Sequence, residues 1–64
     1  MAKYVVSFNP ATKEMDVKHS EEAARELNVV KVDEYSIYTV LVEAANKKHA
    51  QVVGTRLINS YMNE

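Results

Sequence analysis

Near its start the chain has two short segments in which apolar side chains recur at every second position. Residues 3–8 and 14–19 both show a period of two and contain many strand-forming side chains. The connecting residues, 9–13, include Pro10, which fixes its own backbone angle φ and cannot donate to a neighbouring strand. The pattern predicts an antiparallel hairpin with one apolar face. The residues expected on that face are Tyr4, Val6, Phe8, Met15, Val17 and His19.

A short helix is expected after this hairpin. Ser20 is a good N-cap residue, and Glu21 and Glu22 follow it in the first turn, where the helix dipole favours anions. The helix is expected to end near Asn28, a residue that tolerates the left-handed conformation found just beyond many helix ends.

The next apolar stretch allows two interpretations. Residues 35–42 are almost all β-branched or aromatic, which predicts a strand. Some apolar residues of the range 35–45 also recur at helical spacing, so a helix over 35–45 remains the alternative.

The last quarter of the chain has the clearest periodicity. Asn46 is a candidate N-cap, and the apolar residues that follow recur at the spacing of an amphipathic helix. Gly54 lies on this stripe although glycine costs about 1 kcal/mol relative to alanine inside a helix. Its position indicates a close approach of the helix to a strand or to another helix. The stripe consists of Ala50, Val53, Gly54, Leu57, Ile58 and Tyr61.

The predicted order of elements is β-β-α-β-α within one domain, residues 1–64. The expected fold class is α+β, with a three-stranded sheet covered by two helices on one face. Domains below roughly 70 to 80 residues often need disulfides, metals or a second subunit. Because the chain has no cysteine, we expect it to gain stability from tight packing or from association.

The third predicted strand suggests where association takes place. If Tyr38, Val40 and Val42 face the helices, the residues between them face the other way. Apolar surface of this kind often marks an interface, so we expect a homodimer or a constitutive protein partner there. The predicted interface residues are Val5, Ile37, Thr39 and Leu41.

The sequence contains no pattern that predicts catalysis, a metal or a cofactor. Its single glycine lies inside a predicted helix rather than in a phosphate-binding loop. His19 and His49 are far apart in the sequence, and no recognised nucleophile motif is present. We therefore expect a protein that is not an enzyme and that binds neither a metal nor a cofactor.

Charge is distributed unevenly although the net charge is only −1. Residues 19–34 are acidic on balance, whereas residues 44–63 carry three lysine or arginine residues and no acid. Cations near a helix start can bind a phosphate or a carboxylate of a partner. The candidate contact residues are Lys47, Lys48, His49 and Arg56.

These features predict a non-catalytic interaction or regulatory module that binds another macromolecule, with protein as the leading candidate. The alternative is a dimeric nucleic-acid-binding protein that uses the basic C-terminal helix. No stretch of 18 or more apolar residues and no signal-peptide pattern is present, which favours a cytoplasmic protein without membrane contact. Small chains without cysteine are typical of phage or plasmid accessory proteins.

Overall fold

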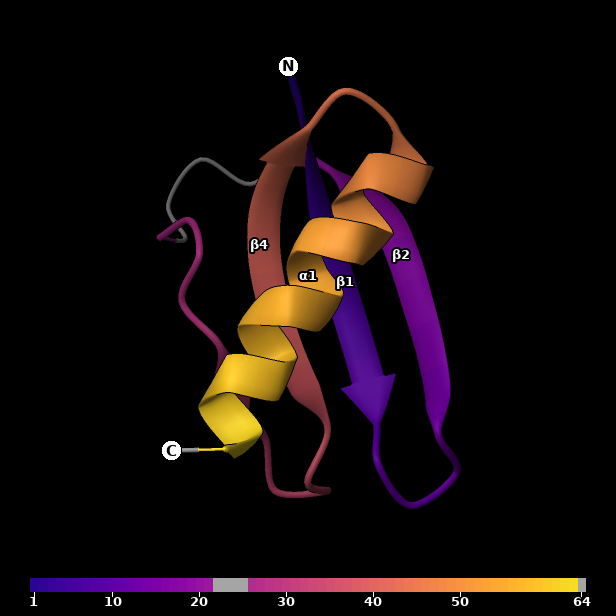
Figure 1. Ribbon diagram of the computed structural model, residues 1–64, viewed down its shortest axis with the longest axis vertical. Coiled ribbons are helices and arrows are strands. Elements are labelled where there is room, and N and C mark those ends of the chain that lie inside the picture. The colour runs from indigo at the N-terminus through magenta and orange to yellow at the C-terminus, as the bar shows by residue number, and fades with distance from the viewer. Residues whose placement is uncertain (22–25, 64) are drawn as a thin grey trace.

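The computed structural model describes residues 1–21 and 26–63, and within them it contains one antiparallel sheet and one helix (Figure 1). The strands follow the order β2-β1-β4-β3 across the sheet, and α1 crosses one face of it. This arrangement confirms the α+β class. The elements are β1 (Ala2–Asn9), β2 (Glu14–Ser20), β3 (Lys31–Val32), β4 (Tyr38–Ala44) and α1 (Lys47–Met62).

The predicted hairpin is confirmed by the pairing of β1 with β2. Val6 lies opposite Val17 in this antiparallel pair. In the connecting turn, the backbone N–H of Lys13 donates to the carbonyl oxygen of Asn9 at 2.7 Å, and Lys13 has a φ of 61°. The Asn9 side chain accepts a further bond from the N–H of Ala11 at 3.0 Å. Asn9 therefore organises the turn through both its backbone and its side chain.

Residues 38–44 form a strand, so the helical alternative for residues 35–45 is wrong. β4 lies between β1 and β3, where it pairs on both sides. Val40 and Val42 are fully buried on the face that α1 covers. A central position and β-branched side chains both favour the strand over a helix.

The prediction of a first helix is wrong wherever the structure describes the segment. Ser20, expected as an N-cap, is the last residue of β2 and lies opposite Lys3 of β1. Residues 26–28 are not helical, and the rest of the predicted helix, residues 22–25, lies outside the described residues. Asn28 does adopt the expected left-handed conformation, with a φ of 64°. Pairing with β1 extends β2 through the residue that would have capped a helix.

The expected three-stranded sheet has a fourth strand. β3 is only two residues long and pairs with the start of β4, with Lys31 opposite Thr39 and Val32 opposite Tyr38. So short a strand has no alternating pattern long enough to be recognised from the sequence. Together with the single helix in the described residues, it corrects the prediction of three strands and two helices.

The core lies between the sheet and α1. Gly54 is buried at the crossing of α1 over β1, where a Cβ atom added to it would lie only 2.6 Å from a Val6 methyl carbon. The predicted close approach of the helix to a strand is thereby confirmed. The buried core residues are Tyr4, Val6, Val40, Val42, Ala44, Ala50 and Ile58.

Candidate interaction surfaces

A row of large apolar side chains crosses three neighbouring strands near the C-terminal end of α1. Phe8 of β1 lies opposite Tyr38 of β4, which in turn lies opposite Val32 of β3. The ring of Tyr61, on the last turn of α1, packs edge-to-face on Tyr38 with ring centroids 5.8 Å apart. We call Phe8, Val32, Tyr38 and Tyr61 the aromatic surface.

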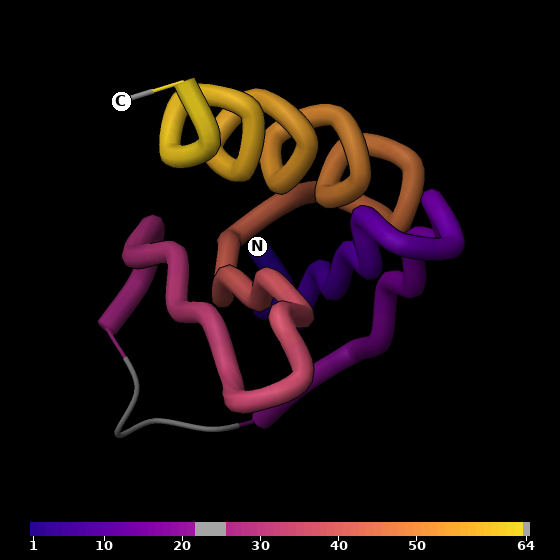
Figure 2. Tube along the Cα trace, turned by 90° about the horizontal axis from the view of Figure 1, so that it is seen from below, coloured from indigo at the N-terminus to yellow at the C-terminus, as the bar shows by residue number. Residues whose placement is uncertain are grey.

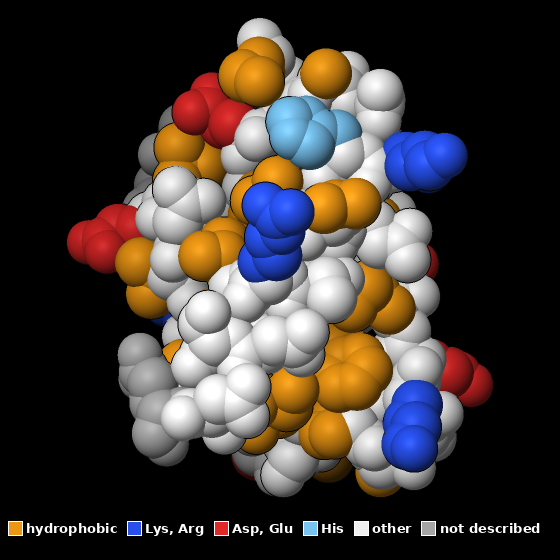
Figure 3. Space-filling model, viewed as in Figure 1, with side chains coloured by type: hydrophobic (Ala, Val, Ile, Leu, Met, Phe, Trp, Pro, Cys, Tyr) orange, Lys and Arg blue, Asp and Glu red, His pale blue; other side chains and the backbone are white. Residues whose placement is uncertain are grey.

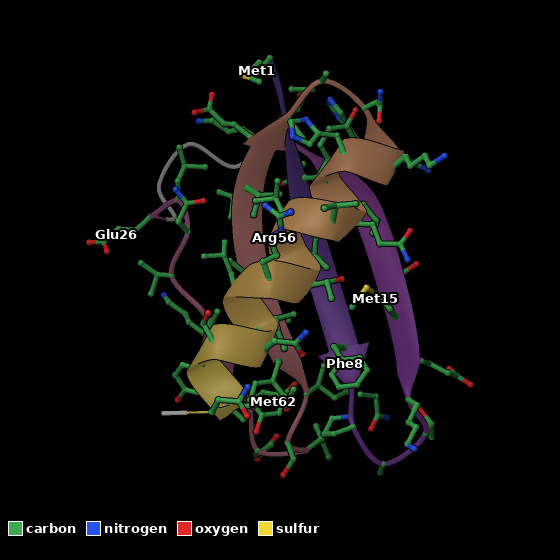
Figure 4. The ribbon with its side chains drawn as sticks, in the orientation of Figure 1. Met1, Phe8, Met15, Glu26, Arg56 and Met62 are labelled. Atoms are coloured by element: carbon green, nitrogen blue, oxygen red, sulfur yellow. The ribbon has the colours of Figure 1, made fainter. Side chains whose placement is uncertain are left out.

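The aromatic surface is accessible in the described structure. Val32 is 42% exposed and Tyr61 is 43% exposed, while Phe8 and Tyr38 are half-buried. Figure 3 shows apolar side chains gathered beside the C-terminal half of α1, and in the same orientation Figure 4 places Phe8 among them. Because α1 crosses the sheet obliquely (Figure 1), this end of the sheet is only partly covered.

A hydrogen-bonded turn next to the aromatic surface carries a further tyrosine. One carboxylate oxygen of Asp33 accepts from the backbone N–H of Tyr35 at 2.8 Å and of Ile37 at 3.0 Å. The N–H of Asp33 donates to the carbonyl oxygen of Ile37, and the N–H of Ser36 donates to that of Asp33, each at 3.1 Å. These bonds restrain the turn while the side chain of Tyr35 stays 74% exposed.

The interface predicted on the opposite face needs a correction. Val5 and Leu41 are direct cross-strand partners, as an apolar cluster on that face requires, and Val5, Thr39 and Ile37 are each half-buried. Leu41, however, is fully buried within the chain. The prediction that Leu41 faces water is therefore wrong, and this side chain offers no accessible surface to a partner.

The chain segment between β2 and β4 explains part of this difference. The backbone N–H of Asn28 donates to the carbonyl oxygen of Leu41 at 2.8 Å, which brings the segment against β4. Figure 2 shows residues 26–37 beside β4 and extending to the side away from α1. If the segment between β2 and β4 ran on the helix side of the sheet, it would not cover Leu41.

The remainder of this second face is mainly polar. The strand register places Lys3, Ser7, Asp16 and Lys18 on it around Val5. An open groove of about 360 Å³ lies at one end, lined by Ser7, Asn9, Glu14, Met15, Asp16 and Ile37. The second face is thus not the continuous apolar patch that was expected.

The predicted basic contact residues are exposed but dispersed. Lys47 and Lys48 occupy the first turn of α1, and Arg56 lies two turns further along. At 100° per residue, Arg56 projects from the side of the helix opposite to Lys47. Figure 3 shows separated blue patches, and Figure 4 labels Arg56 on the outer side of α1. Lys48 lies about 80° from Arg56 around the helix and about 12 Å from it along the axis, so these two cations share one side of α1 without being adjacent.

His49, the fourth member of the predicted basic group, belongs to the helix cap. Its backbone N–H donates to the Asn46 side-chain oxygen at 2.8 Å, and its Nδ1 accepts from the backbone N–H of Ala45 at 3.3 Å. Asn46 has the extended backbone of an N-cap, as predicted. The arrangement resembles a capping box, except that the third helical residue is a histidine and its side chain accepts from the residue before the N-cap.

Replacing Asn46 with alanine should lower the free energy of unfolding by about 1 kcal/mol, because the His49 N–H loses its acceptor. Asn46→Asp should be tolerated, since aspartate is an equally good N-cap residue. Urea unfolding followed by circular dichroism measures both effects. Equal loss of stability in the two variants would contradict this account of the cap.

The described residues contain no group of three or more histidine or acidic side chains placed to hold a metal ion. The ring of His19 packs edge-to-face on Tyr4, with centroids 5.5 Å apart.

In residues 1–21 and 26–63, no helix has the length and apolar character needed to cross a membrane.

Sequence reasoning did not identify the aromatic surface. The helical periodicity places Tyr61 on the buried stripe, and Val32 lies outside every predicted element. The run from Asp33 to Ser36 has the composition of a turn, and this signal would have suggested that Val32 and Tyr38 lie on paired strands.

Comparison of the chain with protein-family models, with curated proteins and with solved structures gave no match.

Proposed function

We propose that this chain is a non-catalytic interaction module that binds another protein through the aromatic surface. The observation that carries the proposal is the accessible row of Phe8, Tyr38 and Val32 with Tyr61 packed on it. Tyrosine and phenylalanine are enriched at the centres of protein interfaces. The strands and the last helical turn hold these side chains in place, so little conformational entropy is lost on binding.

The positions of the charges favour a protein partner over a nucleic acid. Surfaces that bind single-stranded nucleic acid combine aromatic rings with a basic groove. Here Lys47 and Tyr61 lie at opposite ends of α1, about 20 Å apart along the helix axis. Lys47 and Lys48 therefore do not flank the aromatic side chains, and of the predicted basic residues only Arg56 lies within two helical turns of Tyr61. The alternative, a dimeric nucleic-acid-binding protein, rests on the exposure of Lys47, Lys48 and Arg56.

Replacing Tyr61 with glutamine should greatly reduce capture of the partner. The chain and its variants are immobilised and exposed to nuclease-treated lysate of the cells from which the chain comes. We expect the wild-type chain to retain a specific protein and Tyr61→Gln to lose it by at least tenfold, since a central interface tyrosine contributes about 2 kcal/mol. Quantitative mass spectrometry of the bound proteins gives the ratio.

Val52→Gln is the matched control, because Val52 lies on the same helix and is 48% exposed, close to the 43% of Tyr61. This variant should retain the same protein as the wild-type chain. Two results would contradict the proposal and support the nucleic-acid alternative. One is capture from untreated lysate that disappears after nuclease treatment. The other is capture that the double variant Lys47→Ala with Lys48→Ala abolishes and Tyr61→Gln does not.

A further inference from the structure

The two edges of the sheet differ greatly in length. β2 is a seven-residue strand at one edge, paired with β1 on one side only, whereas β3 at the other edge has two residues. A long edge strand presents unpaired backbone N–H and C=O groups that another strand can pair with. Among the described strands, β2 is thus the edge suited to pairing with a second chain.

The sequence of β2 is complementary to itself when two copies run antiparallel. With Val17 opposite Val17 of a second copy, each Asp16 lies opposite Lys18 of the other chain. Opposite charges in directly facing positions stabilise strand pairing. In a single copy, Asp16 and Lys18 are already neighbours, with the Lys18 Nζ 3.7 Å from an Asp16 carboxylate oxygen, and both side chains are exposed.

The neighbouring registers each contain a like-charge pair. Pairing centred on Asp16 places Glu14 opposite Lys18 but also places two aspartates directly opposite each other, and pairing centred on Lys18 places two lysines opposite each other. Like charges in facing positions are destabilising. A lysine on an edge strand commonly prevents association, but in the Val17 register it meets an acid instead. Of these three registers, the charges therefore favour the one centred on Val17, which contains no like-charge pair.

We propose that two copies of this chain associate through β2, antiparallel and centred on Val17. The pairing joins the two sheets into one continuous sheet with both helices on the same face. Val17 and Met15 lie on the helix face of β2, and Met15 faces His19 of the second copy. The aromatic surface lies toward the β3 edge, so it stays accessible at both ends of the dimer. The dimer does not depend on the proposed protein-binding function.

Charge reversal at two positions tests the proposal. Sedimentation equilibrium of the wild-type chain should give the mass of two copies at about 0.1 mM chain, where mass action favours association. Lys18→Asp and Asp16→Lys should each weaken self-association by at least about tenfold, because each places like charges opposite one another. An equimolar mixture of these two variants should recover the dimer, since every facing pair is then of opposite charge.

Lys31→Asp is the matched control, because it makes the same charge change on β3 at the other edge. It should leave the dimer mass unchanged. Circular dichroism should show that all variants stay folded, since the exposed Asp16–Lys18 ion pair adds little stability. A single-chain mass for the folded wild-type protein, unchanged association of both single variants, or failure of the mixture to associate would each overturn the proposal.

Discussion

Replacing Gly54 with alanine should destabilise this protein by about 2 kcal/mol, although alanine is the better helix former by about 1 kcal/mol. The added methyl group would lie 2.6–2.7 Å from three carbon atoms of Val6. Val6 is fully buried in a central strand and cannot move aside as a long flexible side chain would. Overpacking therefore outweighs helix propensity, and the melting temperature should fall by roughly 10 °C.

The direct contact with Val6 predicts partial rescue. Val6→Ala removes both γ carbons that the new methyl group would meet but keeps the Val6 Cβ, which lies 2.7 Å away. The rescue should therefore be partial, and Gly54→Ala with Val6→Ala should be more stable than the sum of the single effects allows. Asn59→Ala, an exposed change on the same helix, should alter stability by no more than about 0.5 kcal/mol. Urea unfolding of the wild-type chain, the two single variants and the double variant gives the coupling. A Gly54→Ala variant as stable as the wild-type chain would show that the helix does not approach β1 this closely.

Replacing Leu41 with alanine should lower the free energy of unfolding by about 2–5 kcal/mol. The side chain is fully buried, and a chain of this length has a total stability on the order of 3–10 kcal/mol. Leu41→Ala should therefore leave a substantial unfolded fraction. The loss should be the same at low and high protein concentration, because Leu41 is buried within one copy of the chain.

Val5→Ala provides the comparison for Leu41. Val5 faces Leu41 across β1 and β4 but is only half-buried, so its truncation should cost less than that of Leu41. Thermal and urea unfolding at two protein concentrations measure both losses. Unchanged monomer stability in Leu41→Ala, together with weaker association, would restore the original prediction of an interface at this residue.

Local patterns predicted much of the fold. The hairpin of β1 and β2 follows from apolar residues at every second position on either side of a turn with Asn9 and Pro10, and α1 follows from an apolar stripe that begins after Asn46. Gly54 was informative because a glycine on a buried stripe has few explanations besides close packing. Each of these signals lies within a few residues of the structure that it determines.

The errors arose where distant contacts decide the structure. Ser20 has the local features of an N-cap, but pairing with Lys3 extends β2 through it. β3 is the exception, since it pairs with residues only six to eight positions away, and it escapes prediction because two residues form no recognisable pattern. Leu41 alternates with inward-facing valines, which indicates an exposed position unless another part of the chain covers it. The contact of Asn28 with β4 could not be read from the sequence.

In the candidate sites too, local sequence predicts some features and contacts between distant residues decide others. Lys47, Lys48 and Arg56 are exposed, as expected of charged helix residues, but their spacing along α1 separates them in space. The aromatic surface depends on the register of three strands and on the ring contact between Tyr38 and Tyr61. The pairing of β1 with β4 and the ring contact join residues far apart in the sequence, whereas the pairing of Val32 with Tyr38 follows from the local turn at Asp33.

The salt dependence of the affinity for the captured partner tests the central claim most directly, namely that the aromatic surface binds protein. An apolar interface is insensitive to salt, whereas phosphate contacts release counterions and weaken steeply. Isothermal titration calorimetry should show an affinity that changes by less than about threefold between roughly 0.05 and 0.5 M salt, and that Tyr61→Gln reduces at least tenfold. A loss of about a hundredfold or more over the same salt range, or full affinity in Tyr61→Gln, would contradict it.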